Sequence, residues 1–181
     1  MTAPWQHPST GLAADRVTAF AALVPVLETP RLRLRAPRIE DFEVYRACLN
    51  DTGGAPADIW LDFNQMVASW PLRGFGPWAI DTIDSDTVGL LPVDHEFGDP
   101  EPEIGWFLTP VARGQGLATE AARAALSALL GPMGFDSIVS YIDVDNIASR
   151  AVAERLGGTQ VTNGGHPAKD VLTHRYERVA Q

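Results

Sequence analysis

The stretch ARGQGLATEA, residues 112–121, decides how the rest of the chain is read. It follows the apolar run IGWFL at Ile104–Leu108, and an alanine-rich pattern with helical spacing begins inside it. A strand, a glycine turn and a helix in this order bring unpaired backbone N–H groups and the positive end of a helix dipole to one point. Glycines there let the backbone close around an anion without side-chain clashes. The stretch therefore predicts an anion site of the kind that binds phosphate groups.

Composition narrows the class of protein that carries this site. The 181 residues suit one domain with a sizeable core, and the apolar and charged shares, 45% and 20%, are those of a globular protein. The net charge of −9 argues against a nucleic-acid binder, which needs a basic surface, and is compatible with a cationic substrate such as an amine.

The cysteine and histidine residues exclude several kinds of site. One cysteine, Cys48, allows no intramolecular disulfide and no cysteine-based zinc site, and its amphipathic surroundings favour a buried thiol. The four histidines are scattered without metal-ligand spacing, so we expect no metal. No apolar run approaches the ~20 residues of a membrane span. We therefore expect a cytoplasmic protein with no membrane or nucleic-acid partner.

The order of elements predicts an α/β fold with a mixed, mostly antiparallel sheet and helices on both faces. After a partly irregular extension, 1–27, strands are expected at 32–37, 78–83, 87–95, 103–108, 137–144, 159–162 and 171–179, and helices at 40–49, 59–70, 116–130 and 146–156. LRLRAP alternates apolar and basic residues as a half-exposed strand does, and Pro92 predicts a kink or an edge position. The loops DTGGAPAD, 51–58, and NGGHPAKD, 163–170, complete this outline.

Two phosphate-binding motifs fit poorly. The Walker pattern GxxxxGK[ST] is absent. The dinucleotide pattern GxGxxG matches at Gly114 and Gly116, but Thr119 replaces its third glycine and about 110 residues precede it, whereas that fold opens with the motif. An NAD-dependent oxidoreductase thus remains a weak alternative.

A third pattern fits better. RGQGLA, 113–118, resembles the Arg/Gln-x-x-Gly-x-Gly/Ala turn of the GNAT superfamily of acyl-CoA-dependent N-acyltransferases. ETPRLRLRAP, RGFGPWAI, EIGWFLTP and NIASRAVAERLGG resemble the first strand, the entry to the second strand, the acyl-CoA strand and the last helix of its ribosomal-protein N-terminal acetyltransferase branch. The similarity spans about Glu28 to Arg178, which implies a GNAT-like domain at 28–181 with a sheet splayed at the CoA site.

The resemblance implies a set of residues that hold acetyl-CoA as co-substrate. The pyrophosphate would bind the turn, and the pantetheine arm would pair with the strand backbone like a short extra strand, which requires that strand to splay from SIVSYIDV, 137–144. A backbone N–H near Phe107 or Leu108 could polarise the thioester carbonyl. Asn146 could hold the arm from the other side, cap its helix, or do both. The implied cofactor residues are Phe107, Leu108, Thr109, Arg113, Gly114, Gln115, Gly116, Leu117, Ala118, Thr119 and Asn146.

The chemistry requires a base, because an amine is protonated at neutral pH and must lose a proton before it attacks a thioester. Glu103, at the start of the acyl-CoA strand, is the expected catalytic acceptor, with Glu101 as second choice; either could instead be a solvated loop acid. Many members place a tyrosine seven residues after the asparagine, where this chain has Ala153. Ser149 is the nearest substitute and would donate a hydrogen bond to the leaving sulfur, unless it is a capping or surface serine.

The sequence therefore predicts an acetyltransferase acting on a primary amine, either a protein N-terminus or a small molecule, as a monomer or homodimer. The alternative is a CoA-binding sensor without catalysis, which the missing tyrosine would suit. Most of the aromatic residues Trp60, Phe63, Trp70, Trp78 and Trp106 are expected in the core, with one or two of those in 59–78 at the acceptor pocket, and Tyr141 between strand and helix.

Overall fold

The computed structural model describes residues 3–49, 54–161, 166, 168 and 170–178. Its helices are α1 (Leu12–Ala21), α2 (Phe42–Cys48), α3 (Pro56–Arg73), α4 (Leu117–Leu130) and α5 (Ile147–Arg155), with short 3-10 turns η1 (Pro4–Gln6), η2 (Ile39–Asp41) and η3 (Pro110–Ala112). Its strands are β1 (Leu27–Glu28), β2 (Leu32–Arg35), β3 (Trp78–Thr82), β4 (Thr87–Leu91), β5 (Val93–Asp94), β6 (Glu103–Ile104), β7 (Phe107–Leu108), β8 (Ser137–Asp143), β9 (Thr159–Val161) and β10 (Val171–Glu177).

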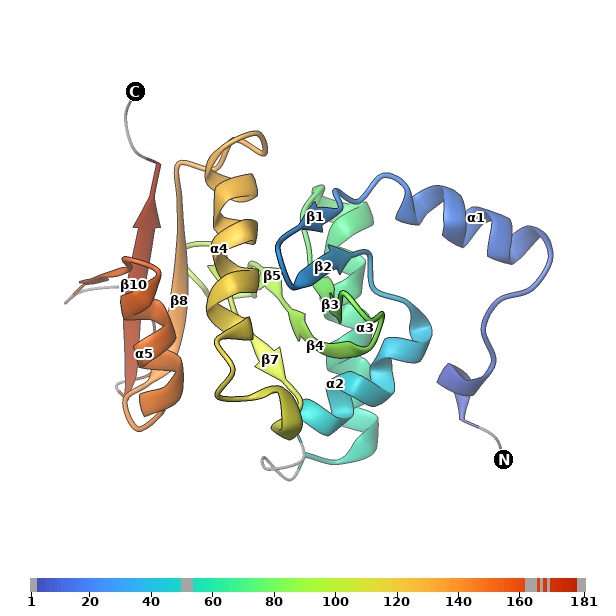
Figure 1. Cartoon of the computed structure of the whole chain (residues 1–181), viewed down its shortest axis with the longest axis horizontal. Helices are drawn as coiled ribbons and strands as arrows, with labels where there is room; N and C mark the ends of the chain where they lie inside the picture. Colours follow the sequence, from blue (N-terminus) through green and yellow to red (C-terminus); the bar gives the residue numbers. More distant parts are fainter. Residues whose placement is uncertain (1–2, 50–53, 162–165, 167, 169, 179–181) are drawn as a thin grey trace.

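The strands form two five-stranded sheets, in the orders β1-β2-β3-β4-β7 and β5-β6-β8-β10-β9 (Figure 1). Only β6 and β8 pair in parallel, and every other pairing is antiparallel among the described residues. This confirms the predicted mixed, mostly antiparallel architecture. The expected strand ends at Thr162 and Val179, and parts of the loops 51–58 and 163–170, lie outside the described residues.

The division between the sheets lies at two broken strands. The kink predicted at Pro92 is present and separates β4 from β5. The single strand predicted at 103–108 is wrong, because β6 and β7 are separate strands in different sheets. At the break, Gly105 donates its N–H to the Pro92 carbonyl (3.0 Å), and a Cβ on Gly105 would lie 2.9 Å from the proline ring. Only glycine fits against the proline there, so the two breaks are coupled.

The coupled breaks open a gap beside β7. Before the break, β6 pairs with β8 at Glu103 and Val139, and the Ser140 hydroxyl donates to the Ile104 carbonyl (2.8 Å). After it, β7 pairs with β4, and β8 runs on in the other sheet (Figure 1). Within the described residues no strand pairs with the other edge of β7. The splay expected between 103–108 and 137–144 is therefore present.

Helices cover both faces of the first sheet, as predicted. Neighbouring residues of one strand point to opposite faces, so Leu91 and Leu108 pack in the cluster that contains α4, whereas Leu90 and Phe107 pack in the cluster of α2 and α3. From α4, the first cluster contains three alanines without exposed surface, at positions 121, 122 and 125, as well as three leucines. The small alanines let α4 lie close to the strands.

The N-terminal extension is attached to the domain at its two ends. Helix α1 has no buried residue and stands away from the sheets (Figure 1). Before it, the Trp5 ring lies 4.4 Å from that of Phe42, and after it Val24 is buried in the core. The boundary proposed between residues 27 and 28 falls inside β1, which pairs with β2.

No helix of the described residues combines the length and the apolar character needed to cross a membrane. A cytoplasmic location stays a prediction from the sequence.

Strand β2 differs from its predicted half-exposed pattern at one residue. Arg33 is exposed as expected, but Arg35 is only 6% exposed. Its guanidinium donates to Asp81 (2.6 Å), to Asp41 (2.8 Å) and to the Thr87 hydroxyl (2.9 Å). This buried ionic network joins β2 to β3, β4 and the start of α2, and the two carboxylates make the burial of the arginine possible.

Replacing Arg35 with methionine keeps most of the side-chain volume but leaves two buried carboxylates without their cation. We expect Arg35→Met to lower the free energy of unfolding by about 3–5 kcal/mol, measured by urea denaturation. Arg33→Met is the matched control, since Arg33 pairs with Glu28 at the surface and should change stability by less than about 1 kcal/mol. Equal effects of the two variants would contradict the role given to the buried network.

Candidate active site

The glycine turn lies at the N-terminus of α4, where the sequence places it. Gly114 and Gly116 have φ of +76° and +77°, the left-handed region that favours glycine, and Gly116 is the N-cap of the helix. Within the described residues, the backbone N–H groups of 114–119 donate no hydrogen bond to the protein. Leu117 is buried and anchors the first turn, while Ala118 and Thr119 are half-buried. The turn thus presents consecutive free donors at a positive helix end.

Arg113 is exposed, but its guanidinium is bound to two backbone carbonyls. The resemblance implies Arg113 as a cofactor residue; in the structure its Nε donates to the Leu108 carbonyl (3.1 Å) and its Nη2 to the Cys48 carbonyl (2.9 Å). The side chain thereby connects β7 with the end of α2. The thiol of Cys48 is buried there, as predicted, and burial raises its pKa to about 12.

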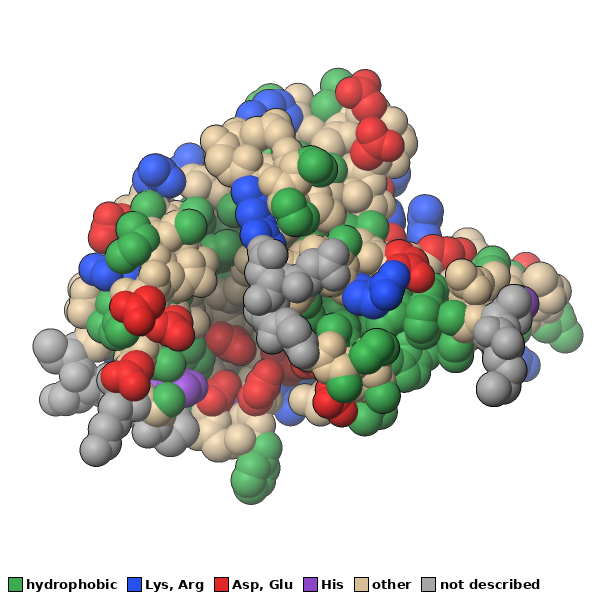
Figure 2. Space-filling view, turned by 90° about the horizontal axis from the view of Figure 1, so that it is seen from below, with side chains coloured by type: hydrophobic (Ala, Val, Ile, Leu, Met, Phe, Trp, Pro, Cys, Tyr) green, Lys and Arg blue, Asp and Glu red, His purple; other side chains and the backbone are tan. Residues whose placement is uncertain are grey.

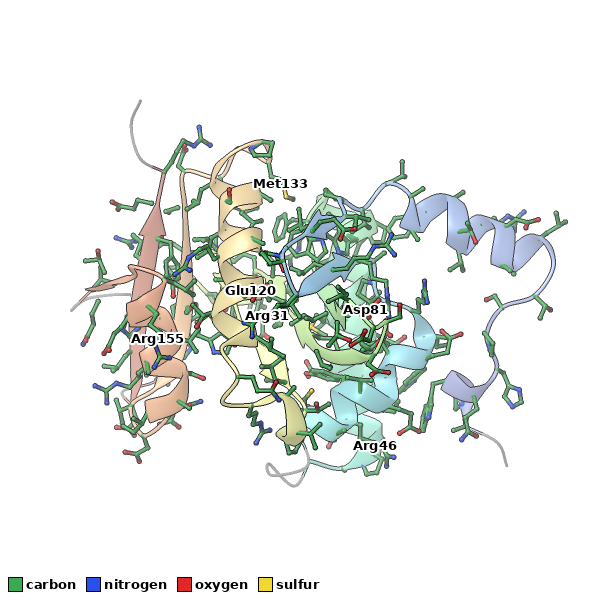
Figure 3. All side chains as sticks on the ribbon, viewed as in Figure 1. Arg31, Arg46, Asp81, Glu120, Met133 and Arg155 are labelled. Atoms are coloured by element: carbon green, nitrogen blue, oxygen red, sulfur yellow. The ribbon has the colours of Figure 1, made fainter. Side chains whose placement is uncertain are left out.

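A second arginine, which the sequence reasoning did not single out, lies behind the turn. Arg31 forms an ion pair with Glu120 in the first turn of α4 (2.6 Å) and donates from Nη1 to the Gln115 carbonyl (3.0 Å) (Figure 3). The Gln115 side chain donates to the Val111 carbonyl (2.8 Å). The sequence pointed to Arg31 only through its place in PRLRL, residues 30–34, at the start of a predicted strand far along the chain from the turn.

The register of β7 determines which backbone groups face the gap. The N–H of Thr109 donates to the Val88 carbonyl (2.9 Å), and its own carbonyl accepts from Ala112 (2.9 Å). Because backbone groups alternate sides along a strand, those of Phe107 also point to β4, and those of Leu108 point to the open edge. The Leu108 carbonyl is held by Arg113, which leaves its N–H directed into the gap.

Glu103 is the first residue of β6, and the charged groups near it are acidic. The residue is half-buried, and its carboxyl forms no ion pair with a described residue. Burial, reinforced by the charges of Asp99, Glu96 and Asp94, raises its pKa to about 7. Figure 2 shows acidic side chains gathered in and beside a hollow on the face seen from below. A carboxyl with such a pKa can accept or give a proton near neutral pH.

Glu101, the second candidate, is engaged elsewhere. Its carboxylate forms an ion pair with Arg175 and accepts a hydrogen bond from the Ser137 hydroxyl (3.0 Å). These two partners fix Glu101 in a structural contact between the loop before β6 and strands β8 and β10. Glu103 is therefore the better placed of the two acids for proton transfer.

Asn146 and Ser149 lie at the start of α5, across the gap from β7. The Asn146 side chain caps the helix by accepting from the N–H of Ser149 (3.0 Å), which confirms the capping alternative. The Ser149 hydroxyl oxygen accepts from the indole of Trp106 (3.2 Å), which lies at the break between β6 and β7. Ala153, at the position of the expected tyrosine, is fully buried. The Trp106–Ser149 contact thus links the two sides of the gap.

The other aromatic residues are mainly structural. Phe63, Trp70 and Trp78 are buried in the core as predicted, and Trp60 packs against Trp5 and Phe42. Tyr141 packs against His166, with ring centroids 4.7 Å apart, rather than between strand and helix as predicted. In the described part of the chain, no three His, Cys, Asp or Glu side chains form a group that could hold a metal.

Solved structures share this architecture. An acetyltransferase from Agrobacterium tumefaciens str. C58 is 33% identical, with a TM-score of 0.79 over 85% of this chain and 95% of that one. The ribosomal L7/L12 α-N-protein acetyltransferase RimL, solved with coenzyme A, is 18% identical, with a TM-score of 0.67 over 84% and 98%. The microcin C7 self-immunity acetyltransferase MccE, solved with acetyl-CoA and AMP, is 18% identical, with a TM-score of 0.62 over 82% and 93%.

A splayed sheet with a glycine turn at the start of α4 is shared with solved acetyltransferases. The family described as "Acetyltransferase (GNAT) domain" matches residues 31–159. The chain belongs to this GNAT family and is an acyl-CoA-dependent acetyltransferase.

The pKa of Glu103 makes the stability of the protein depend on pH. In the unfolded chain the carboxyl ionises near 4.5, and in the folded protein near 7, so the folded state holds the proton more tightly. The free energy of unfolding should fall by roughly 3 kcal/mol as pH rises through this window. Glu103→Gln, which does not ionise, should match the wild type near pH 4 and exceed its stability above pH 8, in urea titrations at each pH.

Glu101→Gln is the control on the same segment. It loses the ion pair with Arg175 and should be no more stable than the wild type above pH 8. A stability difference between Glu103→Gln and the wild type that does not vary with pH would contradict the burial of an ionisable Glu103.

Proposed function

We propose that the chain transfers an acetyl group from acetyl-CoA to a primary amine by direct attack of the amine on the thioester. One observation carries the proposal: Glu103, the free N–H of Leu108 and the glycine turn follow one another along β6, β7 and the start of α4. A base, a donor for the carbonyl and an anion seat thus lie along one continuous path.

The turn supplies the seat for the CoA pyrophosphate. Its candidate donors are the backbone N–H groups of 114–119, which fit an anion because they are free and meet at a helix N-terminus. A Cβ at Gly114 would meet nothing within 4 Å, so the outer side of the turn is open to a ligand. Acetyl-CoA would supply the activated acetyl group as a thioester.

Leu108 and Ser149 would act on opposite sides of the gap. The Leu108 N–H would hold the arm or polarise the thioester carbonyl, since β7 offers it an unpaired edge. The Ser149 hydroxyl accepts from Trp106, so its own hydrogen is free to be donated, and we assign it to the departing sulfur. Asn146 would support Ser149 through the helix cap.

Glu103 would take the proton from the amine. Its raised pKa, near 7, suits proton transfer at neutral pH. The acidic side chains around it would attract the acceptor as an ammonium ion before deprotonation. RimL acts on a ribosomal protein N-terminus; for this chain we propose a cationic amine, either such an N-terminus or a small molecule.

CoA binding can be measured without knowing the acceptor. A ligand that binds only the folded protein at about a hundredfold excess over Kd raises the free energy of unfolding by about 2.7 kcal/mol. We expect such a rise with CoA in thermal or urea unfolding, and we expect Gly116→Val to abolish it, because a β-branched side chain is strained at φ +77°.

Gly134→Val is the matched control for backbone strain. Gly134 has φ +84° near the far end of α4. This variant should lose stability but keep the response to CoA. A wild-type protein that does not respond to millimolar CoA would refute the proposed function, and an unchanged response in Gly116→Val would refute the assignment of the turn.

Turnover tests the role of Glu103. With acetyl-CoA and a panel of peptides with free N-termini, polyamines and amino sugars, thiol release reports the reaction. For the best acceptor, we expect Glu103→Gln to lower kcat/KM by about a hundredfold or more, and the wild-type rate to rise with pH through about 7. Glu101→Gln should retain most of the activity. Activity of Glu103→Gln at the wild-type level would remove Glu103 from the mechanism.

A further inference from the structure

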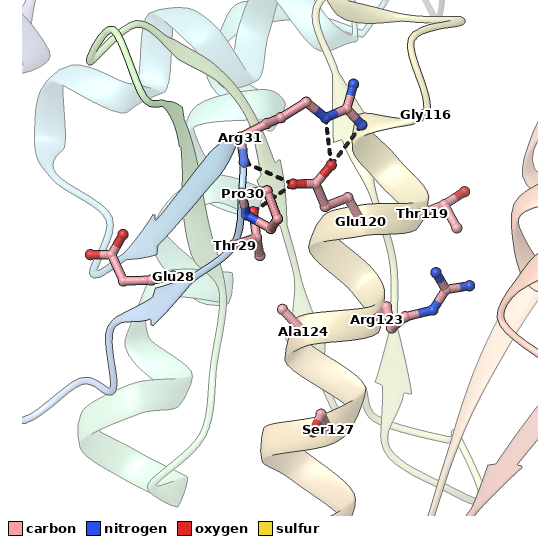
Figure 4. A pocket seen from close by; sticks show the side chains of 10 residues that line it. All are labelled: Glu28, Thr29, Pro30, Arg31, Gly116, Thr119, Glu120, Arg123, Ala124 and Ser127. Atoms are coloured by element: carbon pink, nitrogen blue, oxygen red, sulfur yellow. Dashed lines mark hydrogen bonds and ion pairs between the residues drawn. The ribbon is translucent and has the colours of Figure 1, made fainter.

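An open groove of about 530 Å³ runs along α4 behind the glycine turn. Two oppositely charged residues close its upper end (Figure 4). The Glu120 carboxylate accepts from the Thr29 hydroxyl (2.6 Å) and from the N–H (3.1 Å) and Nε (2.6 Å) of Arg31. Glu120 is less exposed than Arg31, at 18% against 50% of the side chain. The carboxylate is thus held from the start of β2, and it orients the guanidinium.

The guanidinium reaches from Glu120 to the turn itself. Its Nη1 donates to the Gln115 carbonyl (3.0 Å), while Nε and Nη2 both contact Glu120. The Gln115 carbonyl and the Gly116 N–H belong to one planar trans peptide group, in which they point in opposite directions. Fixing the carbonyl toward Arg31 therefore fixes the Gly116 N–H, one of the free donors of the turn, in the direction away from the guanidinium.

We propose that Arg31 and Glu120 form a clamp that positions the peptide group between Gln115 and Gly116 for the CoA pyrophosphate. Arg31 is then a positioning residue that acts through the backbone and not a ligand of the phosphate. The inference rests on the proposed function of the turn.

The negative charge of Glu120 makes it possible to distinguish a positioning role of Arg31 from direct binding of Arg31 to the phosphate. Glu120 offsets the charge of Arg31, and an acid near an anion site would by itself weaken anion binding. If Arg31 contacted the phosphate directly, removal of Glu120 would release it and strengthen binding. If the pair positions the peptide group, removal of either member weakens binding. The effect of Glu120→Ala on affinity therefore has opposite signs under the two hypotheses.

The experiment measures CoA affinity by calorimetry for the wild type, Arg31→Ala and Glu120→Ala. We expect both variants to bind CoA about tenfold more weakly, the effect of one charge-assisted hydrogen bond. Dephospho-CoA, which keeps the pyrophosphate but lacks the 3′-phosphate, should show the same loss. In steady-state assays, KM for acetyl-CoA should rise by a similar factor while kcat changes by less than about twofold.

Two neighbouring residues provide charge-matched controls. Arg33→Ala and Glu28→Ala remove the same charges from the same segment, where these residues form only a surface ion pair, and both should bind CoA within about twofold of the wild type. Unfolding of each variant without ligand separates a general loss of stability from a loss of affinity.

Several outcomes would overturn the clamp. Unchanged or tighter CoA binding by Glu120→Ala would mean that Arg31 contacts the pyrophosphate directly. A loss of affinity that is seen with CoA but not with dephospho-CoA would mean that Arg31 contacts the 3′-phosphate. Wild-type affinity in both variants would show that the pair is dispensable. A wild type that binds no CoA would instead refute the proposed function, so the two failures are distinguishable.

Discussion

The contact between Pro92 and Gly105 is the constraint on which the rest of the structure depends. Proline interrupts one strand because it lacks an N–H, and only glycine in the facing strand fits against its ring. Both strands therefore break at the same level, and the sheet divides into two. The division leaves one edge of β7 unpaired among the described residues, and this open edge is the one to which the proposed function assigns the arm of acetyl-CoA.

The position of α4 follows from small residues and from charges at its first turn. Alanines without exposed surface let the helix lie close to the strands, so its N-terminus is fixed relative to β7. Arg113 and Arg31 then hold the turn from two sides by donating to backbone carbonyls of β7, α2 and Gln115. In the proposed function, the free N–H groups of the turn and the helix dipole attract the anion, while these two guanidinium groups hold the backbone in place.

Acidic residues have opposite energetic roles in different parts of the molecule. Asp41 and Asp81 are buried with Arg35, and their hydrogen bonds hold β2, β3 and α2 together. Glu103 is half-buried beside further acids and has no ion-pair partner among the described residues, so its pKa is raised and its ionisation costs stability. Such a cost is typical of residues retained for proton transfer, since a fully paired carboxylate would be a weak base.

The sequence by itself determined the order of the elements, the glycine turn before α4 and the family resemblance, because glycine, proline and apolar periodicity act over a few residues. It also identified Glu103, Asn146 and Ser149 as candidates from their places in the motifs. Only the tertiary structure decided that 103–108 is two strands, that Arg35 is buried, and that Arg113 donates to the Leu108 carbonyl. It alone showed that Arg31 contacts Gln115 and Glu120. It also distinguished the two candidate acids, because Glu101 pairs with Arg175 and Glu103 pairs with no described cation. These features depend on contacts between residues as far as 89 positions apart, which no local pattern encodes.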